Sequence, residues 1–163
     1  MRVQEIPTAH TPPGGYGDEM PPPILLGCTE PLAPGTPDLR GTWRTLDATG
    51  SGVALPAEHP MWRHVERIEQ AGTRVVVTAN GIVHDMVADG TYEHGVHDVM
   101  AADLATAIVV AASFENGVLV LRPRDMPHVK VQRWRVGELL VWRYDRLFTV
   151  MMERVEEPTR LSA

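Results

Sequence analysis

Residues 74–90 read RVVVTANGIVHDMVADG, in which two runs rich in β-branched residues are separated by Asn80-Gly81 and the second run ends near Asp89-Gly90. Asn-Gly and Asp-Gly are strong signals for two-residue type I′ turns, because both central residues of such a turn need a positive φ. The stretch therefore predicts a hairpin of strands over 73–79 and 82–88, followed by a third antiparallel strand over 91–99.

Similar turn signals separate the predicted strands along the rest of the chain. Turn signals also stand at Ala71-Gly72, Asn116-Gly117 and Val136-Gly137, between runs with many β-branched and aromatic residues. The further strands that we expect span 41–47, 64–70, 106–114, 118–122, 128–136, 139–144 and 147–155. Because sequential hairpins lose their exposed edges when the sheet closes, the sequence predicts an all-β, up-and-down antiparallel barrel of 8–10 strands over 39–157. The only helix that we expect is a turn or two near Ala57–Arg63.

The N-terminal segment 1–38 differs in composition from the barrel. Residues 1–37 hold 9 of the 14 prolines and 5 of the 14 glycines, which remove backbone donors and resist ordering. Two interpretations stay open: a disordered extension, or an arm that folds over the barrel and covers an opening, with Ile24-Leu25-Leu26 as an apolar contact. Residues 158–163 are expected to form a C-terminal tail.

The composition excludes several classes of protein. With 163 residues, 44% of them apolar, one domain can bury a core without disulfides or metals. The net charge of −6 argues against general nucleic-acid binding, and no apolar run approaches the ~18 residues of a membrane span. A single cysteine, Cys28, and the lack of an apolar signal segment fit a cytoplasmic location. The oligomeric state stays open.

Residues 39–44, LRGTWR, resemble the start of the first strand in the calycin superfamily, which comprises lipocalins and cytosolic fatty-acid-binding proteins. The resemblance implies that Trp43 packs under Arg154 of the last strand and closes one barrel end, and that the barrel holds a hydrophobic small molecule. The Arg-x-Tyr pair with which fatty-acid binders grip a carboxylate would fall on Val150 and Met152. The segment 48–62 leaves room for one short helix in place of their two-helix lid, so the lid role is vacant or belongs to the arm.

Turn geometry predicts which residues of the later strands line the barrel. With Val136-Gly137 as the turn, Arg133 pairs with Leu140, and a largely apolar face forms that we assign to the inner wall. Its members are Val129, Val131, Arg133, Leu140, Trp142 and Tyr144. A buried arginine needs a partner. Three interpretations remain: a carboxylate inside the barrel, an anionic group of a ligand, or a register error that places Arg133 outside.

The segment 82–98 carries three of the seven histidines. Its more apolar face, which we expect to face inward, holds His84, Met86, Glu93, Gly95 and His97. His84 would lie diagonal to Glu93 and His97, a cluster able to donate and accept protons. The opposite register would place Asp85, Tyr92 and His94 inside instead. The same groups could also simply satisfy one another. His59 and His64 are expected at the surface or the rim.

These features predict a cofactor-independent enzyme of the isomerase, cyclase or dehydratase type that acts on a hydrophobic small molecule inside the barrel. Arg133 would stabilise an oxyanion, and His84 with Glu93 or His97 would move a proton. Met86, Val131, Trp142 and Tyr144 would contact the ligand. The sequence shows no motif for a metal or a nucleotide cofactor, so neither is expected. The alternative is a non-catalytic carrier, which mutual pairing of the inner polar groups would favour.

Overall fold

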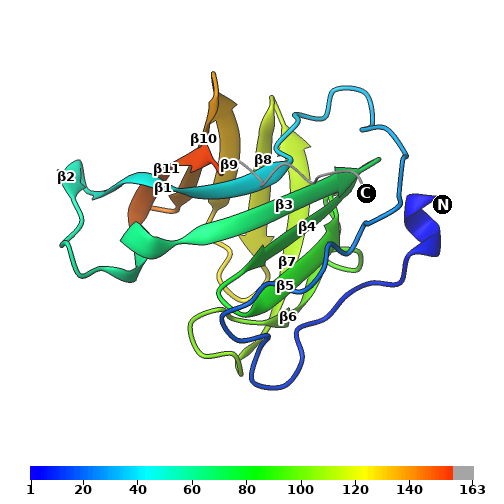
Figure 1. The fold of residues 1–163 in the computed structure, drawn as a ribbon, viewed down its shortest axis with the longest axis horizontal. Helices are drawn as coiled ribbons and strands as arrows, with labels where there is room; N and C mark the ends of the chain where they lie inside the picture. Colours follow the sequence, from blue (N-terminus) through cyan, green and yellow to red (C-terminus); the bar gives the residue numbers. More distant parts are fainter. Residues whose placement is uncertain (156–163) are drawn as a thin grey trace, which may run out of the picture.

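The computed structural model describes residues 1–155, and the predicted tail 158–163 and the barrel limit at 157 lie outside them. One antiparallel sheet runs in the order β5-β4-β3-β1-β11-β10-β9-β8-β7-β6, with β2 paired to β1 alone (Figure 1). The strands are β1 (Gly41–Gly50), β2 (Val53–Ala54), β3 (Val65–Ala71), β4 (Arg74–Ala79), β5 (Ile82–Val87), β6 (Val96–Val99), β7 (Ala107–Glu115), β8 (Val118–Pro123), β9 (Val131–Val136), β10 (Leu139–Tyr144) and β11 (Phe148–Arg154). The predicted all-β barrel is confirmed, and it is nearly closed, with a seam between the edge strands β5 and β6.

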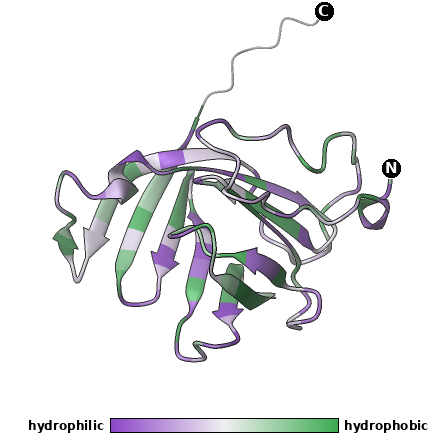
Figure 2. Ribbon diagram, turned by 90° about the horizontal axis from the view of Figure 1, so that it is seen from below, coloured by the Kyte–Doolittle hydropathy of each residue, from purple (hydrophilic) through white to green (hydrophobic). Residues whose placement is uncertain are grey.

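Two turns show how firmly the sequence specifies the inner face. Asn80 and Gly81 have φ values of 51° and 85°, as a type I′ turn requires, and they pair Val77 with His84. The turn placed at Val136-Gly137 was wrong by one position, because Val136 pairs with Leu139. This shift moves the pairing by two residues, so Arg133 faces Trp142 rather than Leu140 but stays on the same face. Hydrophobic and hydrophilic bands alternate along the strands (Figure 2).

The strand predicted over 91–99 was wrong in its first half. Residues 91–95 form a turn around Asp89, whose carboxylate accepts hydrogen bonds from the amide and hydroxyl of Thr91 and contacts Nδ1 of His94. Such a local side-chain turn competes with a strand ladder, so only β6 remains extended. One hydrogen bond, from the Val87 amide to the His94 carbonyl, leads toward β6 (2.8 Å). The Asp89-Gly90 hairpin therefore does not pair β5 with β6.

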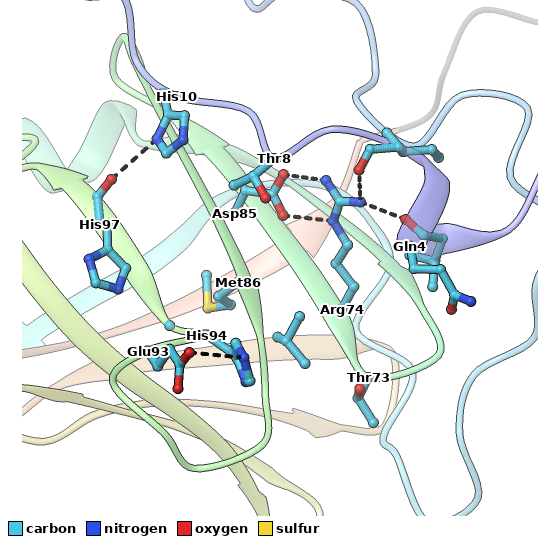
Figure 3. A pocket seen from close by; sticks show the side chains of 14 residues that line it. Gln4, Thr8, His10, Thr73, Arg74, Asp85, Met86, Glu93, His94 and His97 are labelled. Carbon is cyan, nitrogen blue, oxygen red and sulfur yellow. Dashed lines mark hydrogen bonds and ion pairs between the residues drawn. The ribbon is translucent and has the colours of Figure 1, made fainter.

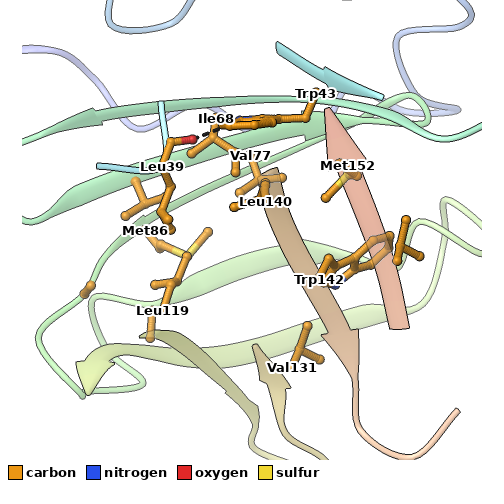
Figure 4. Packing of buried hydrophobic residues seen from close by; sticks show 14 of the residues in the cluster. Leu39, Trp43, Ile68, Val77, Met86, Leu119, Val131, Leu140, Trp142 and Met152 are labelled. Carbon is orange, nitrogen blue, oxygen red and sulfur yellow. Dashed lines mark hydrogen bonds between the residues drawn. The ribbon is translucent and has the colours of Figure 1, made fainter. Parts of the chain in front are cut away.

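One end of the barrel, which we call the closed end, is sealed around Trp43. Its indole is fully buried and donates a hydrogen bond to the Leu39 carbonyl (3.0 Å). The guanidinium carbons of Arg154 and Arg135 lie 4.5 and 5.2 Å from the Trp43 ring centre. Gly41 has a φ of 142°, a backbone conformation that other residues rarely adopt, which explains the glycine there. The packing that the calycin resemblance implied for Trp43 and Arg154 is thus present, above the main core (Figure 4).

The arm, residues 1–38, is ordered, and it lies on the outer face of β3–β5 rather than over the open end (Figure 1). It begins with the short 3-10 helix η1 (Val3–Glu5) and forms a second small core with the sheet. This core contains Val3, Leu25, Ala71, Val76 and Val83. The arm is therefore packed against the sheet rather than disordered. It does not cover the barrel mouth, where we expected a lid.

A buried ion pair attaches the arm to the sheet. Arg74 and Asp85 pair at 2.6 Å with side chains 7% and 2% exposed. All five N–H groups of Arg74 are used, two by Asp85 and three by the carbonyls of Val3, Ile6 and Pro7. The second Asp85 oxygen also accepts the Ala9 amide (2.9 Å). The pair is thus fully hydrogen-bonded, and three of its contacts are to arm carbonyls.

The arm also crosses the seam. The Thr11 hydroxyl bonds with both the amide and the carbonyl of Val83 in β5, while its amide donates to Asp98 in β6 (2.9 Å). Arm backbone and side chains thus provide hydrogen bonds where the two edge strands lack a ladder. The arm therefore bridges the seam between β5 and β6.

We expect Arg74→Met to destabilise the fold by about 3–5 kcal/mol, because it leaves Asp85 buried without its cation. Urea unfolding measures this loss, and limited proteolysis should show faster cleavage within residues 1–20. The matched control is Arg40→Met, which removes a half-exposed ion pair with Asp38 and should cost at most about 1 kcal/mol. Equal effects of the two substitutions would contradict a structural role for the buried pair.

Candidate functional site

The inner side chains are most deeply buried near the closed end and less buried toward the other end, which we call the mouth. Along β10, Leu140 is 0% exposed, Trp142 is 8% exposed and Tyr144 is half-buried. Leu119 at 0% and half-buried Leu121 repeat this gradient on β8. A side chain with no accessible area has no water-sized space beside it, so the closed half of the barrel, where we expected part of a cavity, is filled by side chains.

Half-buried apolar side chains surround the mouth. They are Leu55, Met61, Trp62, Ile108, Leu121, Val129, Tyr144 and Phe148, and they pack against the main core, as does half-buried Phe114, which lies opposite Leu119. Three of them belong to the connection between β1 and β3, which includes the short 3-10 helix η2 (Pro60–Arg63) and confirms the predicted helix near Ala57–Arg63. The Phe148 ring lies 5.2 Å from Trp142 and 5.4 Å from Tyr144. We call this set the mouth ring.

Arg133 points into the barrel and is paired there with a carboxylate. Its Nε donates to Glu66 Oε2 at 2.8 Å and its Nη2 donates to Oε1 at 3.2 Å, with Arg133 6% and Glu66 0% exposed. His64 Nε2 lies 2.7 Å from Glu66 Oε1. Of the three interpretations for Arg133, the carboxylate partner inside the barrel is the one that the structure shows.

Trp142, on the adjacent strand β10, packs against this cluster. The Arg133 guanidinium carbon lies 4.8 Å from the Trp142 ring centre, and the His64 ring lies 4.6 Å from it. His64 was expected at the surface or rim and is instead 3% exposed, because Glu66 and Asn80 supply partners for both ring nitrogens. Trp142 and Val131 face inward and belong to the main core, with Tyr144 in the mouth ring, and that they contact a ligand stays a prediction.

Glu66 was missed by the sequence analysis, although a signal for it was present. In strand β3, Glu66, Ile68 and Gln70 alternate onto one face, and Ile68 marks that face as the inner one. A barrel with an arginine inside needs an acid on an inner face, and Glu66 is such an acid.

The charges of this cluster are fixed by its own contacts. Burial alone would raise the pKa of Glu66, but the Arg133 cation and the hydrogen bond from His64 together lower it to about 2. Glu66 is therefore ionised at neutral pH, and its charge balances that of Arg133.

His84 faces the interior from β5, as predicted. Its Nε2 lies 2.8 Å from the Val99 carbonyl, so this nitrogen carries the proton and Nδ1 is left as an acceptor. Burial lowers the pKa of His84, and the positive charge of Arg133 contributes in the same direction, against the carbonyl of Val99 and Asp98. His84 is thus a neutral base in the mouth half. Met86, two residues on, is 1% exposed and belongs to the core.

Glu93 and His97 do not join His84. Both are exposed, and they line a pocket of about 570 Å³ between the arm and the β5–β6 edge strands (Figure 3). The predicted cluster of His84, Glu93 and His97 is therefore wrong, because the 91–95 turn replaces the strand that would have aligned them. The alternative inward set fails as well: Asp85 lies under the arm, and Tyr92 and His94 are exposed.

The described residues contain neither a metal-binding cluster nor a membrane-spanning helix. Among residues 1–155, no three His, Cys, Asp or Glu side chains gather so that they could hold a metal ion. No helix in that range is long and apolar enough to cross a bilayer.

The up-and-down antiparallel topology and the end sealed at Trp43 together define a calycin-type barrel. Comparison with solved structures agrees: human cRBP IV, a cellular retinol-binding protein, superposes with a TM-score of 0.55 at 14% identity, over 72% of this chain and 98% of that chain. At this identity the likeness concerns the fold. No family model and no curated protein matches the sequence.

We expect the stabilising effect of Glu66 to depend on pH. Its pKa is about 2 in the folded protein, against about 4.3 in the unfolded chain. A carboxyl whose pKa is lowered by folding stabilises the protein above its unfolded pKa, and the effect is lost as the pH falls toward its folded pKa. The difference in free energy of unfolding between wild type and Glu66→Gln should therefore shrink by roughly 3 kcal/mol from pH 5 to pH 2.

Urea unfolding at several pH values measures this difference. Glu153→Gln is the matched control, because it removes the same charge from the outer face, where Glu153 pairs with Arg44. A wild-type to Glu66→Gln difference that stays constant with pH would show that Glu66 is not ionised inside the barrel.

Proposed function

We propose that this protein is a carrier that binds a hydrophobic small molecule in the mouth half of its barrel. The observation that supports it most is the paired state of Arg133 on the apolar inner face of the barrel. Two nitrogens of Arg133 donate hydrogen bonds to Glu66, and His64 contacts the same carboxylate. These interior polar groups therefore satisfy one another. Mutual pairing of this kind favours binding over chemistry, since a charge already neutralised stabilises a developing oxyanion poorly.

The surface that the ligand would contact is apolar and accessible. The mouth ring and the inner residues Val131 and Trp142 keep accessible area, whereas the layer below them does not. Ligand sites are mostly apolar with a few placed polar groups, which describes this half of the barrel. The likeness to human cRBP IV supports a hydrophobic ligand of this general kind. A cytoplasmic location remains a prediction.

The test is the binding of Nile red, a neutral dye that fluoresces in apolar surroundings. Ile108→Glu should weaken the binding at least tenfold, because it places a charge in the mouth ring and the ligand would bury it. The matched control is Val109→Glu, one residue along the same strand and outside both core clusters, where less than a threefold change is expected. Equal effects, or no saturable binding by wild type, would contradict the proposed site.

A second candidate function is an isomerase-type enzyme, supported by His84 alone. Its Nδ1 is a neutral acceptor in the mouth half, and such a group can remove a proton next to a carbonyl. The paired state of Arg133 speaks against this candidate, because the resulting enolate would lie beside Glu66 as well.

Proton exchange in D₂O separates the two candidates. If His84 is a base, wild type should exchange the α-protons of 2-decanone for deuterium faster than buffer does, and His84→Phe should lose this activity while still binding Nile red. NMR of the recovered ketone measures the exchange. His59→Phe, at the mouth outside the Glu66 cluster, is the control. A wild-type rate equal to that of buffer would leave the carrier as the function.

A further inference from the structure

The pocket between the arm and the edge strands β5 and β6 has no part in the proposed function, and we call it the seam pocket. Its lining includes Ile6, Thr8, His10, Val87, Glu93 and His97 (Figure 3). Its volume of about 570 Å³ lies within the usual range of small-molecule sites. Half-buried Ile6 and Val87 give it an apolar wall beside its polar groups, a composition that such sites usually have. None of its described lining residues belongs to the mouth ring.

No cation of the described lining is free to bind an anion. Arg74 is the one arginine or lysine there, and all five of its N–H groups are used by Asp85 and by carbonyls of the arm. His94 donates a hydrogen bond from Nδ1 to Asp89 (2.5 Å). The hydrogen bond and the charge of Asp89 raise the pKa of His94, so a positive charge on His94 is already balanced. The seam pocket therefore does not suit an anionic ligand.

The free polar groups of the seam pocket are acceptors. The Glu93 side chain is 85% exposed and makes no hydrogen bond within residues 1–155, and its ion-pair contact with His94 Nε2 is long, at 4.0 Å. His97 Nε2 lies 2.7 Å from the Tyr92 carbonyl, and His10 Nδ1 lies 3.2 Å from the His97 carbonyl. Because a carbonyl only accepts, these two nitrogens carry protons, and in the neutral rings His97 Nδ1 and His10 Nε2 are left as acceptors.

We infer that the seam pocket binds an organic ammonium ion, a primary amine joined to an apolar body about as large as a phenyl ring. A primary ammonium group has three N–H donors, which match the Glu93 carboxylate and one nitrogen each of His10 and His97. Glu93 supplies the opposite charge, and Ile6 and Val87 contact the apolar body. Because the seam pocket and the mouth ring share none of these residues, the inference does not depend on the proposed function.

Three ligands of similar size test the charge preference: phenethylamine, 2-phenylethanol and 3-phenylpropanoate. They are titrated at pH 8, which is above the usual pKa of histidine and below that of an alkylamine. Calorimetry should show phenethylamine binding at least tenfold more tightly than 2-phenylethanol, with 3-phenylpropanoate the weakest. Phenethylamine should also shift the NMR amide signals of Val87 and Gly95, which line the pocket. No saturable binding of phenethylamine, or equal binding of 3-phenylpropanoate, would overturn the inference.

Nile red separates this site from the barrel. Saturating phenethylamine should change the affinity of wild type for Nile red less than twofold. Displacement of the dye would place the amine in the mouth half and overturn the inference, while the proposed function stands. If phenethylamine shifts the Val87 and Gly95 signals and Nile red does not bind, the proposed function fails and the inference stands.

Two substitutions at exposed positions assign the binding to residues of the seam pocket. Glu93→Gln removes the charge, so phenethylamine should bind at least fivefold more weakly, whereas Glu138→Gln, exposed and outside the pocket, should have no effect. Thr8→Trp fills the pocket and should abolish binding, whereas Thr29→Trp, exposed on the same arm outside the pocket, should not. Wild-type affinity in Glu93→Gln or in Thr8→Trp would overturn the inference.

Discussion

The ion pair between Glu66 and Arg133 constrains this barrel more than any other contact. Two full charges stand inside an apolar wall, which is tolerable only because they are paired at 2.8 Å and further bonded by His64. The pair joins β3 to β9, on opposite sides of the sheet order, so it ties together strands that share no backbone ladder. It also divides the interior, with packed apolar side chains toward Trp43 and accessible apolar side chains toward the mouth.

A second buried pair, Arg74 with Asp85, has the corresponding role on the outer face. It uses the same physical device, a buried cation paired with a carboxylate, and here three further hydrogen bonds of the cation go to carbonyls of a proline-rich segment. The arm, which has almost no regular secondary structure, is held in place in this way by a side chain of the neighbouring sheet. The arm then crosses the seam through Thr11, so the seam and the arm stabilise each other.

The sequence predicts the barrel well because its evidence is local. Asn80-Gly81 and Asn116-Gly117 specify turns within a few residues, and the alternation of side chains then assigns each residue to a face of the sheet. The turn near Gly137 was misplaced by one residue, which shifts the pairing of the two strands by two residues. Because this shift is an even number, Arg133 stayed on the inner face. The first half of 91–99 failed for the opposite reason. There the Asp89 carboxylate gathers Thr91 and His94 into a turn, and a pattern of alternating residues contains no sign of that competition.

The candidate site was less predictable because its pairs are distant in sequence. Arg133 could be placed inside from its strand alone, yet its partner lies 67 residues away, and choosing among the acids requires knowing which strands face each other across the barrel. The same limit explains why His64 was assigned to the rim. Its neighbours in sequence look like a loop, and only the positions of Glu66 and Trp142 show that it is enclosed. Local periodicity therefore predicts whether a side chain points inward or outward. The chemistry of this site depends instead on which side chain lies opposite, and the order of strands around the barrel determines that.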